Sequence, residues 1–579
     1  MPKDDPRDLM DWLGFRAAPN FARARWIGAG VSVLLSVLFV LALVAAFMVL
    51  VHTIGQAGNT ATEGPNLGAG ALIAALLGAP FLIWGTWLKY QTVRYQKEGH
   101  ITDRINKAVE QLGAEKTVKV RGQDADGKEV NHEETRPNIE VRIGAILSLE
   151  RIAQDSTTHD KGRDHVRVME ILCAYVRENS NARKPVDFPE PEWESLKDGA
   201  SVVERAVHEE KLEERFGPFY SGSKAWEWAR TLPKPRADVA LVLKVIGRRT
   251  VAQRRAEAAW PEAPDETTLW PFDRPCPRLP DEAGEAALSS EALEDFRQRL
   301  KAWQDTLAAY KGYRLGLTGA NLQRADLAAT RPDASDAVFG GARLSGTRLE
   351  GANLGQARME GANLGQARME GASLWQARME GASLGQARME GADLGQARME
   401  GAYLGEARME GADLRQARME GAYLGEARME GASLWQARME GAHLIEARME
   451  GASLGGARME GADLKQARME GADLRRARME GADLRGVVMD GRTDLKDAAL
   501  DGASMRFVDL REVAITQAQL GVVFADGSMA GMLPEGANRP AHWPVWVFSI
   551  LWDPSFDDEL ARWRAEGAAY RPPLPPGGG

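Results

Sequence analysis

Residues 351–360 read Gly-Ala-Asn-Leu-Gly-Gln-Ala-Arg-Met-Glu, and close variants of this decapeptide follow one another without a gap to residue 480. Each decapeptide holds two units of five residues, and a Leu or Met stands at the centre of every unit from Leu344 to Met489. A small residue, usually Ala, stands two places before each centre. A five-residue period fits neither the 3.6-residue turn of an α-helix nor the unbroken alternation of a β-strand. The pattern predicts a coiled solenoid with flat sides, in which each unit alternates once toward the core and then turns a corner.

The spacing in units such as Ala352-Asn353-Leu354 and Ala392-Asp393-Leu394 resembles the pentapeptide-repeat family. The resemblance implies a right-handed quadrilateral β-helix with four units in each coil. At the ~4.8 Å separation of neighbouring strands, the thirty units between residues 342 and 491 would form a rod segment roughly 36 Å long. Flanking centres, such as Leu327 and Leu495, lie out of phase with this run. We therefore expect insertions near Arg331 and Asp494 within one continuous rod.

Two apolar runs precede the repeats. Residues 27–51 contain no charged side chain, and residues 67–88 are interrupted only by Pro80. About 20 apolar helical residues cross the ~30 Å hydrocarbon core of a bilayer, so the two runs predict a transmembrane helical hairpin over residues 27–92. Lys and Arg flank the hairpin on both outer sides and are missing from the short connecting loop. The positive-inside rule then places both termini and the repeat domain in the cytoplasm, with the protein in the inner (cytoplasmic) membrane.

The region between the hairpin and the repeats has a mixed pattern. The charged stretch 116–137 is interpreted as a loop, and the Pro-rich stretch 250–285 as a linker or surface insertion. Apolar residues at helical spacing predict helices over 101–112, 141–152, 166–176, 238–246 and 293–307. The expected fold class is therefore α+β multidomain. Its expected parts are a cytoplasmic N-terminal segment (1–26), the transmembrane hairpin (27–92), a cytoplasmic helical region (93–249), a Pro-rich linker plus helix (250–314), the β-helix (315–522), a C-terminal cap (523–570) and a disordered tail (571–579).

A second resemblance covers the helical region and the end of the chain. Segments 101–112, 141–156 and 163–179 look like the helical segment that precedes the repeats in membrane-anchored bacterial members of the pentapeptide-repeat family. The stretches 533–536 and 539–543 are similar to the segment that often closes such chains. The uniform decapeptides and the Pro-rich insertion depart from the usual member. This subtype carries no established activity, so the resemblance implies an anchor and a repeat rod but no reaction.

Outward-facing positions separate into uniform and variable columns. Arg and Glu flank the Met centres, and an offset of one coil would stack Arg358 on Arg378 and Glu360 on Glu380. Each Arg column then runs beside a Glu column, which predicts a nearly neutral, salt-screened surface. The sequence varies beside the Leu centres. One face would present Trp375, Arg415, Trp435 and Arg475, and the opposite face Tyr403, Tyr423 and His443.

These seven side chains are the candidate protein-binding residues. Exposed aromatic side chains at regular spacing on a rigid rod are typical of a docking strip. Stacking between the rings of successive coils would place them in the same positions for stability alone. Both interpretations stay open at the level of the sequence.

The search for a catalytic or cofactor site gives little. Neither Cys173 nor Cys276 has metal-ligand spacing around it. His159 and His165, the closest histidine pair, fall in a predicted loop and are interpreted as solvated. No phosphate-binding loop, dinucleotide fingerprint or nucleophile elbow occurs in a fitting context. We therefore expect no enzyme activity, no metal and no cofactor.

Two classes of function remain. The first is a membrane-anchored cytoplasmic scaffold that binds a protein partner, touches the lipid bilayer through two helices and is compatible with a homo-oligomer. The second is a DNA mimic that regulates a DNA-binding protein such as gyrase, as in the gyrase-binding pentapeptide proteins. Residues 342–491 carry 20 basic and 23 acidic side chains, too near neutral to imitate a duplex with one charge per ~1.7 Å. This balance favours the scaffold, and the net charge of −10 on the whole chain argues against nucleic acid as a partner.

Overall fold

The computed structural model describes residues 101–573, apart from 124–128, 160, 183, 192, 195–200, 217–222, 280–287, 332 and 550, and a few single residues between 41 and 89. Residues 1–104 and 105–579 form two separate compact units. Most of the predicted transmembrane hairpin and most of the predicted disordered tail lie outside the described residues. Within the described part, no helix combines the length and the apolar character that crossing a bilayer requires.

Near the start of the larger unit, a β-hairpin forms where the sequence predicts a loop. Strands β1 (Glu115–Gln123) and β2 (Glu129–Pro137) pair antiparallel, with Lys119 opposite Glu133. The prediction was wrong because the high charge of this stretch conceals its β-branched residues, such as Val118 and Val120. The pairing of β-branched residues and of Lys119 with Glu133 favours a two-stranded ribbon despite the charge of the stretch.

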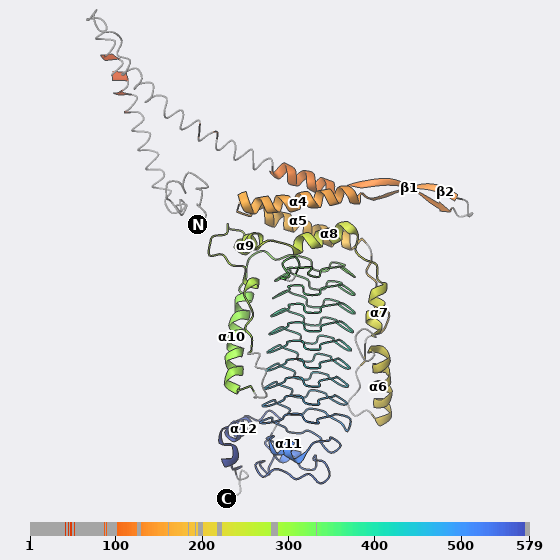
Figure 1. The fold of residues 1–579 in the computed structure, drawn as a ribbon, viewed down its shortest axis with the longest axis vertical. Helices are drawn as coiled ribbons and strands as arrows, with labels where there is room; N and C mark the ends of the chain where they lie inside the picture. Colours follow the sequence, from red (N-terminus) through yellow and green to blue (C-terminus); the bar gives the residue numbers. More distant parts are fainter. Residues whose placement is uncertain are drawn as a thin grey trace, which may run out of the picture. The chain divides into compact units, whose positions relative to one another are not determined.

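Packed helices follow the hairpin (Figure 1). Helices α4 (Ile139–His159), α5 (Arg163–Ser180) and α8 (Ala237–Gly247) contact one another and bury Ile146, Leu172 and Leu243. Residues 101–112 are also helical, as predicted. The remaining described helices and 3-10 turns of this unit are α6 (Val202–Phe216), α7 (Lys224–Thr231), α9 (Val251–Ala259), η2 (Pro271–Asp273), α10 (Ser290–Ala308), α11 (Gln517–Gly521), η3 (Gly527–Met529), α12 (Pro554–Glu566) and η4 (Gly567–Ala569).

The repeats form a continuous stack of coils. Parallel β-bridges join residues 20 positions apart, from Val338↔Arg358 to Arg468↔Val488, so four units complete each coil (Figure 1). The Leu and Met centres and the Ala residues before them point inward, and Leu384 and Ala382, for example, are at most 1% exposed. Bridges that enclose the expected insertions have longer offsets, at Asp326↔Asn353 and Asp473↔Asp494, and further bridges continue beyond both. The structure therefore confirms insertions within one continuous rod.

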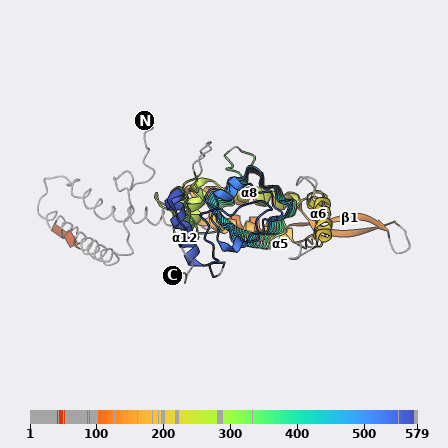
Figure 2. The same cartoon turned by 90° about the horizontal axis from the view of Figure 1, so that it is seen from below.

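Helices cover two opposite faces of this rod, each along a column of glycines that follow the Met centres (Figures 1 and 2). Helix α10 covers one column, and a Cβ added to Gly381 would lie 2.7 Å from the Trp303 ring. Helices α7 and α6 cover the other. A Cβ added to Gly371 would lie 2.6 Å from the carbonyl oxygen of Ala225, and one at Gly431 would lie 2.5 Å from a methyl carbon of Leu212. The Met-centred faces are therefore buried, and the two Leu-centred faces remain open.

The Pro-rich stretch is not a linker over the residues that the structure describes. Trp270, Phe272, Cys276 and Leu279 are buried in one cluster with α10. The backbone carbonyl of Phe272 accepts a hydrogen bond of 3.1 Å from the Arg358 guanidinium of the rod. Proline content predicts the absence of regular structure, but it does not exclude packing. Here the aromatic side chains between the prolines supply the apolar surface that fixes the segment to the rod.

Both ends of the coil stack are capped, which leaves no open sheet edge there. At the first coil, the backbone N–H of Asn321 donates to Ser180 Oγ and Asn181 Oδ1 at the end of α5, at 3.2 and 3.1 Å. At the last coil, the backbone carbonyl of Val523 accepts a 2.7 Å hydrogen bond from the indole of the fully buried Trp543. A hydrophobic cluster completes this cap and comprises Phe524, Phe548, Phe556, Leu560 and Tyr570.

Two glycines with the same backbone test whether the covering helix depends on the glycine column. Gly381 and Gly346 have φ of 61° and 62°, but only Gly381 lies under α10, and a Cβ on Gly346 would meet nothing within 4 Å. Replacement by Ala costs about 1 kcal/mol of left-handed backbone strain at either site. Only Gly381→Ala should also loosen α10, seen as faster hydrogen exchange over residues 290–308. Equal exchange in the two variants would show that α10 is held by other contacts.

Candidate docking faces

The two open faces carry all seven candidate residues. Face A consists of the units centred on the Leu residues at 20-residue intervals from Leu354 to Leu474, and face B of those from Leu364 to Leu484. Trp375 and Trp435 on face A are 41% and 45% exposed, and Tyr403 and Tyr423 on face B are 49% and 43% exposed. The structure thus separates the candidates into two sites on opposite faces, as the 20-residue offset predicts, and it does not bring them into one cleft.

On face A, each tryptophan lies over a glycine of the next coil. A Cβ on Gly395 would lie 3.3 Å from the Trp375 ring, and one on Gly455 would lie 3.2 Å from the Trp435 ring. The next coil presents an arginine in each case. Arg415 and Arg475 occupy these positions, and each forms a two-point ion pair with the Asp two places earlier in its own coil. Face A therefore repeats a Trp, Gly, Arg pattern every three coils, a distance of about 14 Å.

On face B, aromatic rings stack along the rod. The ring centroids of Tyr403 and Tyr423 lie 5.0 Å apart with an interplanar angle of 4°, and His443 continues the row at 6.3 Å with a tilt of 39°. Partial burial lowers the pKa of His443, so its ring is neutral at pH 7. The two tyrosines form a ladder, and they also remain exposed. Stacking and availability for docking are therefore compatible at this site.

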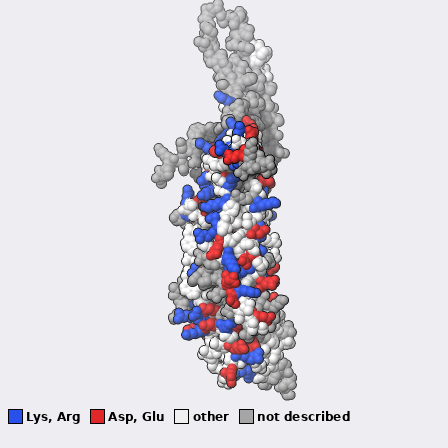
Figure 3. Space-filling view, turned by 90° about the vertical axis from the view of Figure 1, so that its right-hand side faces the viewer, with Lys and Arg blue, Asp and Glu red and all other residues white. Residues whose placement is uncertain are grey.

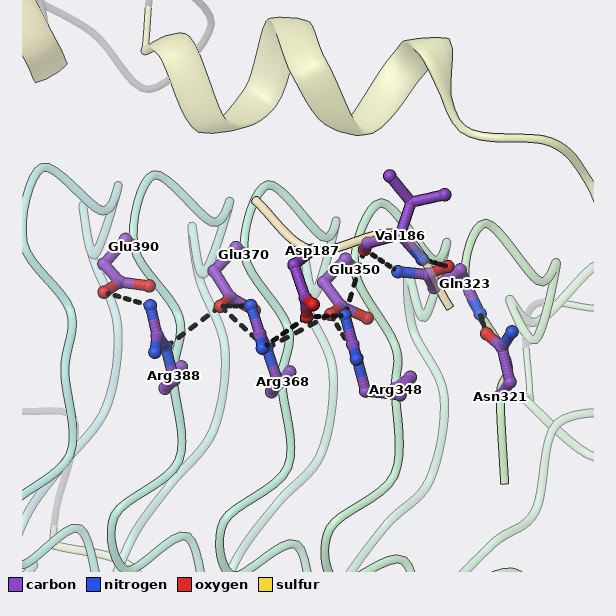
Figure 4. Close-up of polar contacts among 10 residues, drawn as sticks. All are labelled: Val186, Asp187, Asn321, Gln323, Arg348, Glu350, Arg368, Glu370, Arg388 and Glu390. Atoms are coloured by element: carbon purple, nitrogen blue, oxygen red, sulfur yellow. Dashed lines mark hydrogen bonds and ion pairs between the residues drawn. The ribbon is translucent and has the colours of Figure 1, made fainter. Parts of the chain in front are cut away.

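The Arg and Glu flanking the Met centres do not form the salt-screened surface that the sequence predicts. From Glu350 to Glu440, every Glu that follows a Leu or Met centre in this series is at most 1% exposed. Each lies between the Arg of its own coil and that of the next. Glu370, for example, has Arg368 at 3.1 Å and Arg388 at 3.0 Å (Figure 4). The prediction was wrong because the covering helices and their flanking segments exclude water from these columns.

Burial raises the pKa of several of these carboxyl groups. Desolvation raises the pKa of Glu370, Glu410 and Glu420 to about 8, and repulsion from the Glu residues of adjacent coils adds to the effect. The neighbouring arginines act in the opposite direction. Consistent with this, the Oε2 atoms of Glu350 and Glu370 are buried with no hydrogen-bond partner among the described residues.

Sequence reasoning missed a set of amide ladders at the corners of the open faces. Beside face A, the Gln356 side-chain amide donates to Gln376 at 3.0 Å, and Gln376 donates in turn to Gln396 at 2.7 Å. Beside face B, Gln366 donates to Gln386 at 3.0 Å, and Gln386 to Glu406 at 3.1 Å. The signal was present in the recurrence of Gln at 20-residue spacing. Such ladders tie successive coils together at the surface.

The geometry of the polar groups away from the open faces indicates a structural role. His165 belongs to α5 and is fully buried, with Nε2 2.9 Å from Glu257 Oε1, so its interpretation as a solvated loop residue was wrong. Arg249 also contacts Glu257, at 3.3 Å, and the group joins α5 to α9. Burial raises the pKa of the Cys173 and Cys276 thiols. No group of three metal-ligating side chains occurs among the described residues.

The fold and these faces define a repeat protein of the quadrilateral β-solenoid class with two exposed faces. A family model described as "Pentapeptide repeats (8 copies)" matches residues 337–376, 357–396, 382–421, 392–431, 422–461 and 452–491. HetL, a pentapeptide repeat protein of the cyanobacterium Nostoc involved in heterocyst differentiation regulation, is 34% identical over 33% of this chain and 84% of its own, with a TM-score of 0.22. The chain belongs to the pentapeptide-repeat family.

Two other solved structures are more distant. QnrB1, a plasmid-mediated fluoroquinolone resistance protein, is 19% identical over 31% of this chain and 90% of its own, with a TM-score of 0.22. A pentapeptide repeat protein of the Arabidopsis thaliana thylakoid lumen is 29% identical over 21% of this chain and 69% of its own, with a TM-score of 0.13. No match to a curated protein sequence was found.

The buried carboxyl groups make the stability of the rod depend on pH. Burial raises the pKa of Glu410 to about 8 in the folded chain, from about 4.5 in the unfolded chain. The folded chain therefore binds more protons than the unfolded chain. The stability that Glu410 contributes is complete below pH ~4.5 and is lost as the pH rises through about 8. We expect the free energy of unfolding to fall between pH 6 and pH 9. Glu410→Gln should reduce that fall by about 1–2 kcal/mol in denaturant titrations at the two pH values.

The matched control is Glu426→Gln, which removes an exposed carboxylate in the neighbouring coil and so tests the change in net charge alone. A fall in stability of the same size in the Glu410→Gln variant and in the wild type would show that Glu410 is ionised throughout this pH range.

Proposed function

We propose that the protein is a non-catalytic scaffold, anchored in the inner membrane by the hairpin over residues 27–92, whose cytoplasmic repeat domain binds a partner protein through faces A and B. The observation that carries the proposal is the division of the rod surface. The two Met-centred faces are uniform and covered by helices, whereas the exposed aromatic residues lie on the open faces. Regularly spaced, half-exposed aromatic side chains on a rigid support are the features of a protein-docking surface.

Exposed apolar side chains in the smaller unit support the anchor. Five described helical residues within the predicted first span, Leu41, Val44, Phe47, Met48 and Val51, are 47–67% exposed. Large apolar side chains in such a row are unfavourable in water and favourable in a bilayer. The basic residues on both outer sides of the hairpin set the proposed orientation, with both termini and the repeats in the cytoplasm.

Regulation of a DNA-binding protein by DNA mimicry is the second candidate function. A mimic needs exposed rows of negative charge at the spacing of duplex phosphates. Here the regular Glu columns are buried and paired with Arg. On the side of the molecule drawn in Figure 3, basic and acidic side chains are interspersed, with no continuous acidic stripe.

Proximity labelling in native membranes tests the scaffold. The intact protein is compared with a variant carrying Trp375→Ala, Trp435→Ala, Tyr403→Ala and Tyr423→Ala. We expect specific partners of the intact protein to be lost from the variant while its circular dichroism is unchanged, because the core residues are untouched. The matched control is Val203→Ala on α6, which removes a side chain that is 73% exposed outside the open faces. An unchanged partner list would assign the rings to ladder stacking and refute docking through these faces.

Membrane fractionation tests the anchor. The full chain should remain in the pellet after alkaline carbonate extraction, and a chain lacking residues 27–92 should move to the supernatant. Reporter fusions after residue 58 and at the C-terminus should report opposite sides of the membrane. Extraction of the full chain into the supernatant would refute the anchor, and the partner-labelling comparison would then be repeated in cytosol.

A further inference from the structure

The tyrosine stack on face B ends beside a groove. Tyr423 covers one face of the Tyr403 ring. The coil before Tyr403 has an exposed serine, Ser383, at the position of the ring. The space beside Tyr403 is a groove of about 260 Å³. Its lining comes from the repeats alone and comprises Ser345, Gly365, Gln366, Gly385, Gln386, Tyr403, Gly405 and Glu406.

The floor of this groove has the same construction as the floor beneath the stacked rings. Tyr403 and Tyr423 each lie across the glycine two places after them, and a Cβ on Gly405 or Gly425 would come within 2.7 Å of a tyrosine hydroxyl. Gly385 and Gly365 continue the same glycine column under the groove. The rod therefore provides a flat floor and one aromatic wall for a further planar group, and Ser383 does not fill the space.

The charged residues around the groove differ at its two ends: exposed Arg343 lies two coils before Ser383 in the same column, and acidic residues lie on the side of Tyr403. Exposed Glu406, Glu426 and Glu446 stand in the corner column of the three coils that carry Tyr403, Tyr423 and His443. Glu406 lines the groove and already accepts one hydrogen bond from Gln386. The basic residues that follow on face B, Lys465 and Arg485, are occupied. They pair with Asp463 and Asp483 and lie 5.2 and 5.7 Å from the Trp552 ring of the C-terminal cap.

We propose that face B recognises an arginine-bearing segment of the partner protein, with one guanidinium group stacked on the free face of Tyr403 and paired with Glu406. A guanidinium is planar, stacks on aromatic rings and directs several N–H donors outward at its edge. An ammonium group has no plane to stack, and a neutral ring would leave the carboxylates of this column without a counter-charge. Further basic residues of the segment would pair with Glu426 and Glu446. This inference rests on the proposed scaffold function and names the chemistry of its partner.

The test uses the purified full chain in neutral detergent and a fluorescent peptide of alternating Arg and Ser, with the matched Lys and Gln peptides as controls. Binding is measured by fluorescence anisotropy at fixed salt. We expect the Arg peptide to bind about tenfold more tightly than the Lys peptide, the difference that stacking adds to charge, and the Gln peptide not to bind. Glu406→Gln should weaken the Arg peptide by a similar factor. Trp375→Ala, on face A, should not change binding.

The sharpest variant is Ser383→Tyr. It should place a third ring over Gly385 and against Tyr403, which preserves the coil and fills the groove. We expect it to weaken binding of the Arg peptide at least tenfold while melting at or above the wild-type temperature. Wild-type affinity in Ser383→Tyr, or equal affinity for the Arg and Lys peptides, would overturn the proposal. If Ser383→Tyr does not fold, unchanged binding by Glu406→Gln overturns it alone. If the peptide test fails but the four-residue variant loses its partners, recognition of arginine is refuted and the scaffold function still holds.

Discussion

The register between coils is the constraint on which the repeat domain depends. Backbone hydrogen bonds fix each residue to the one 20 positions later, so side chains of identical type are stacked along the rod. At ~4.8 Å separation, a column of like charges is unfavourable unless opposite charges alternate with it. In the Arg columns, each Glu carboxyl group is placed between the guanidinium groups of two successive coils, which keeps those like charges apart. Burial of these columns is therefore possible only because the register is regular.

The same register divides the coil into two kinds of face. The residue at each corner has positive φ in both kinds of unit, and Gln tolerates this backbone, as at Gln356 with φ of 58°. The turn therefore does not explain why the corners after the Met centres carry glycine. The packing of α10, α7 and α6 explains it, since a Cβ at Gly381 or Gly371 would collide with the helix. The decapeptide is the sequence form of a coil with alternating covered and open faces.

The rod itself could be derived from the sequence. The five-residue period, the inward residues and the phase shifts near Arg331 and Asp494 depend on local spacing alone. The covered faces could not be derived from the sequence, because they depend on the contacts that α10 and the segment around Trp270 make with the rod. The composition of the uniform Arg, Met and Glu pattern fits a solvent-exposed face and a buried face equally well. The difference was present only as a contrast between glycine and glutamine corners. His165 and Glu257 were missed for a related reason, since they are 92 residues apart in the chain.

Different residues of each coil provide stability and recognition. The Leu, Met and Ala core and the buried ion pairs hold the rod whatever occupies the open faces, so these faces can vary. Positions on the open faces nevertheless vary together, because an aromatic ring at one position requires a glycine at the neighbouring one. Trp375 lies over Gly395, Trp435 over Gly455, and Tyr403 over Gly405. A ring held against a glycine is fixed in orientation and still 41–49% exposed. Ladder stacking and docking are thus not competing explanations, since the first holds the aromatic side chain in the rigid posture that the second requires.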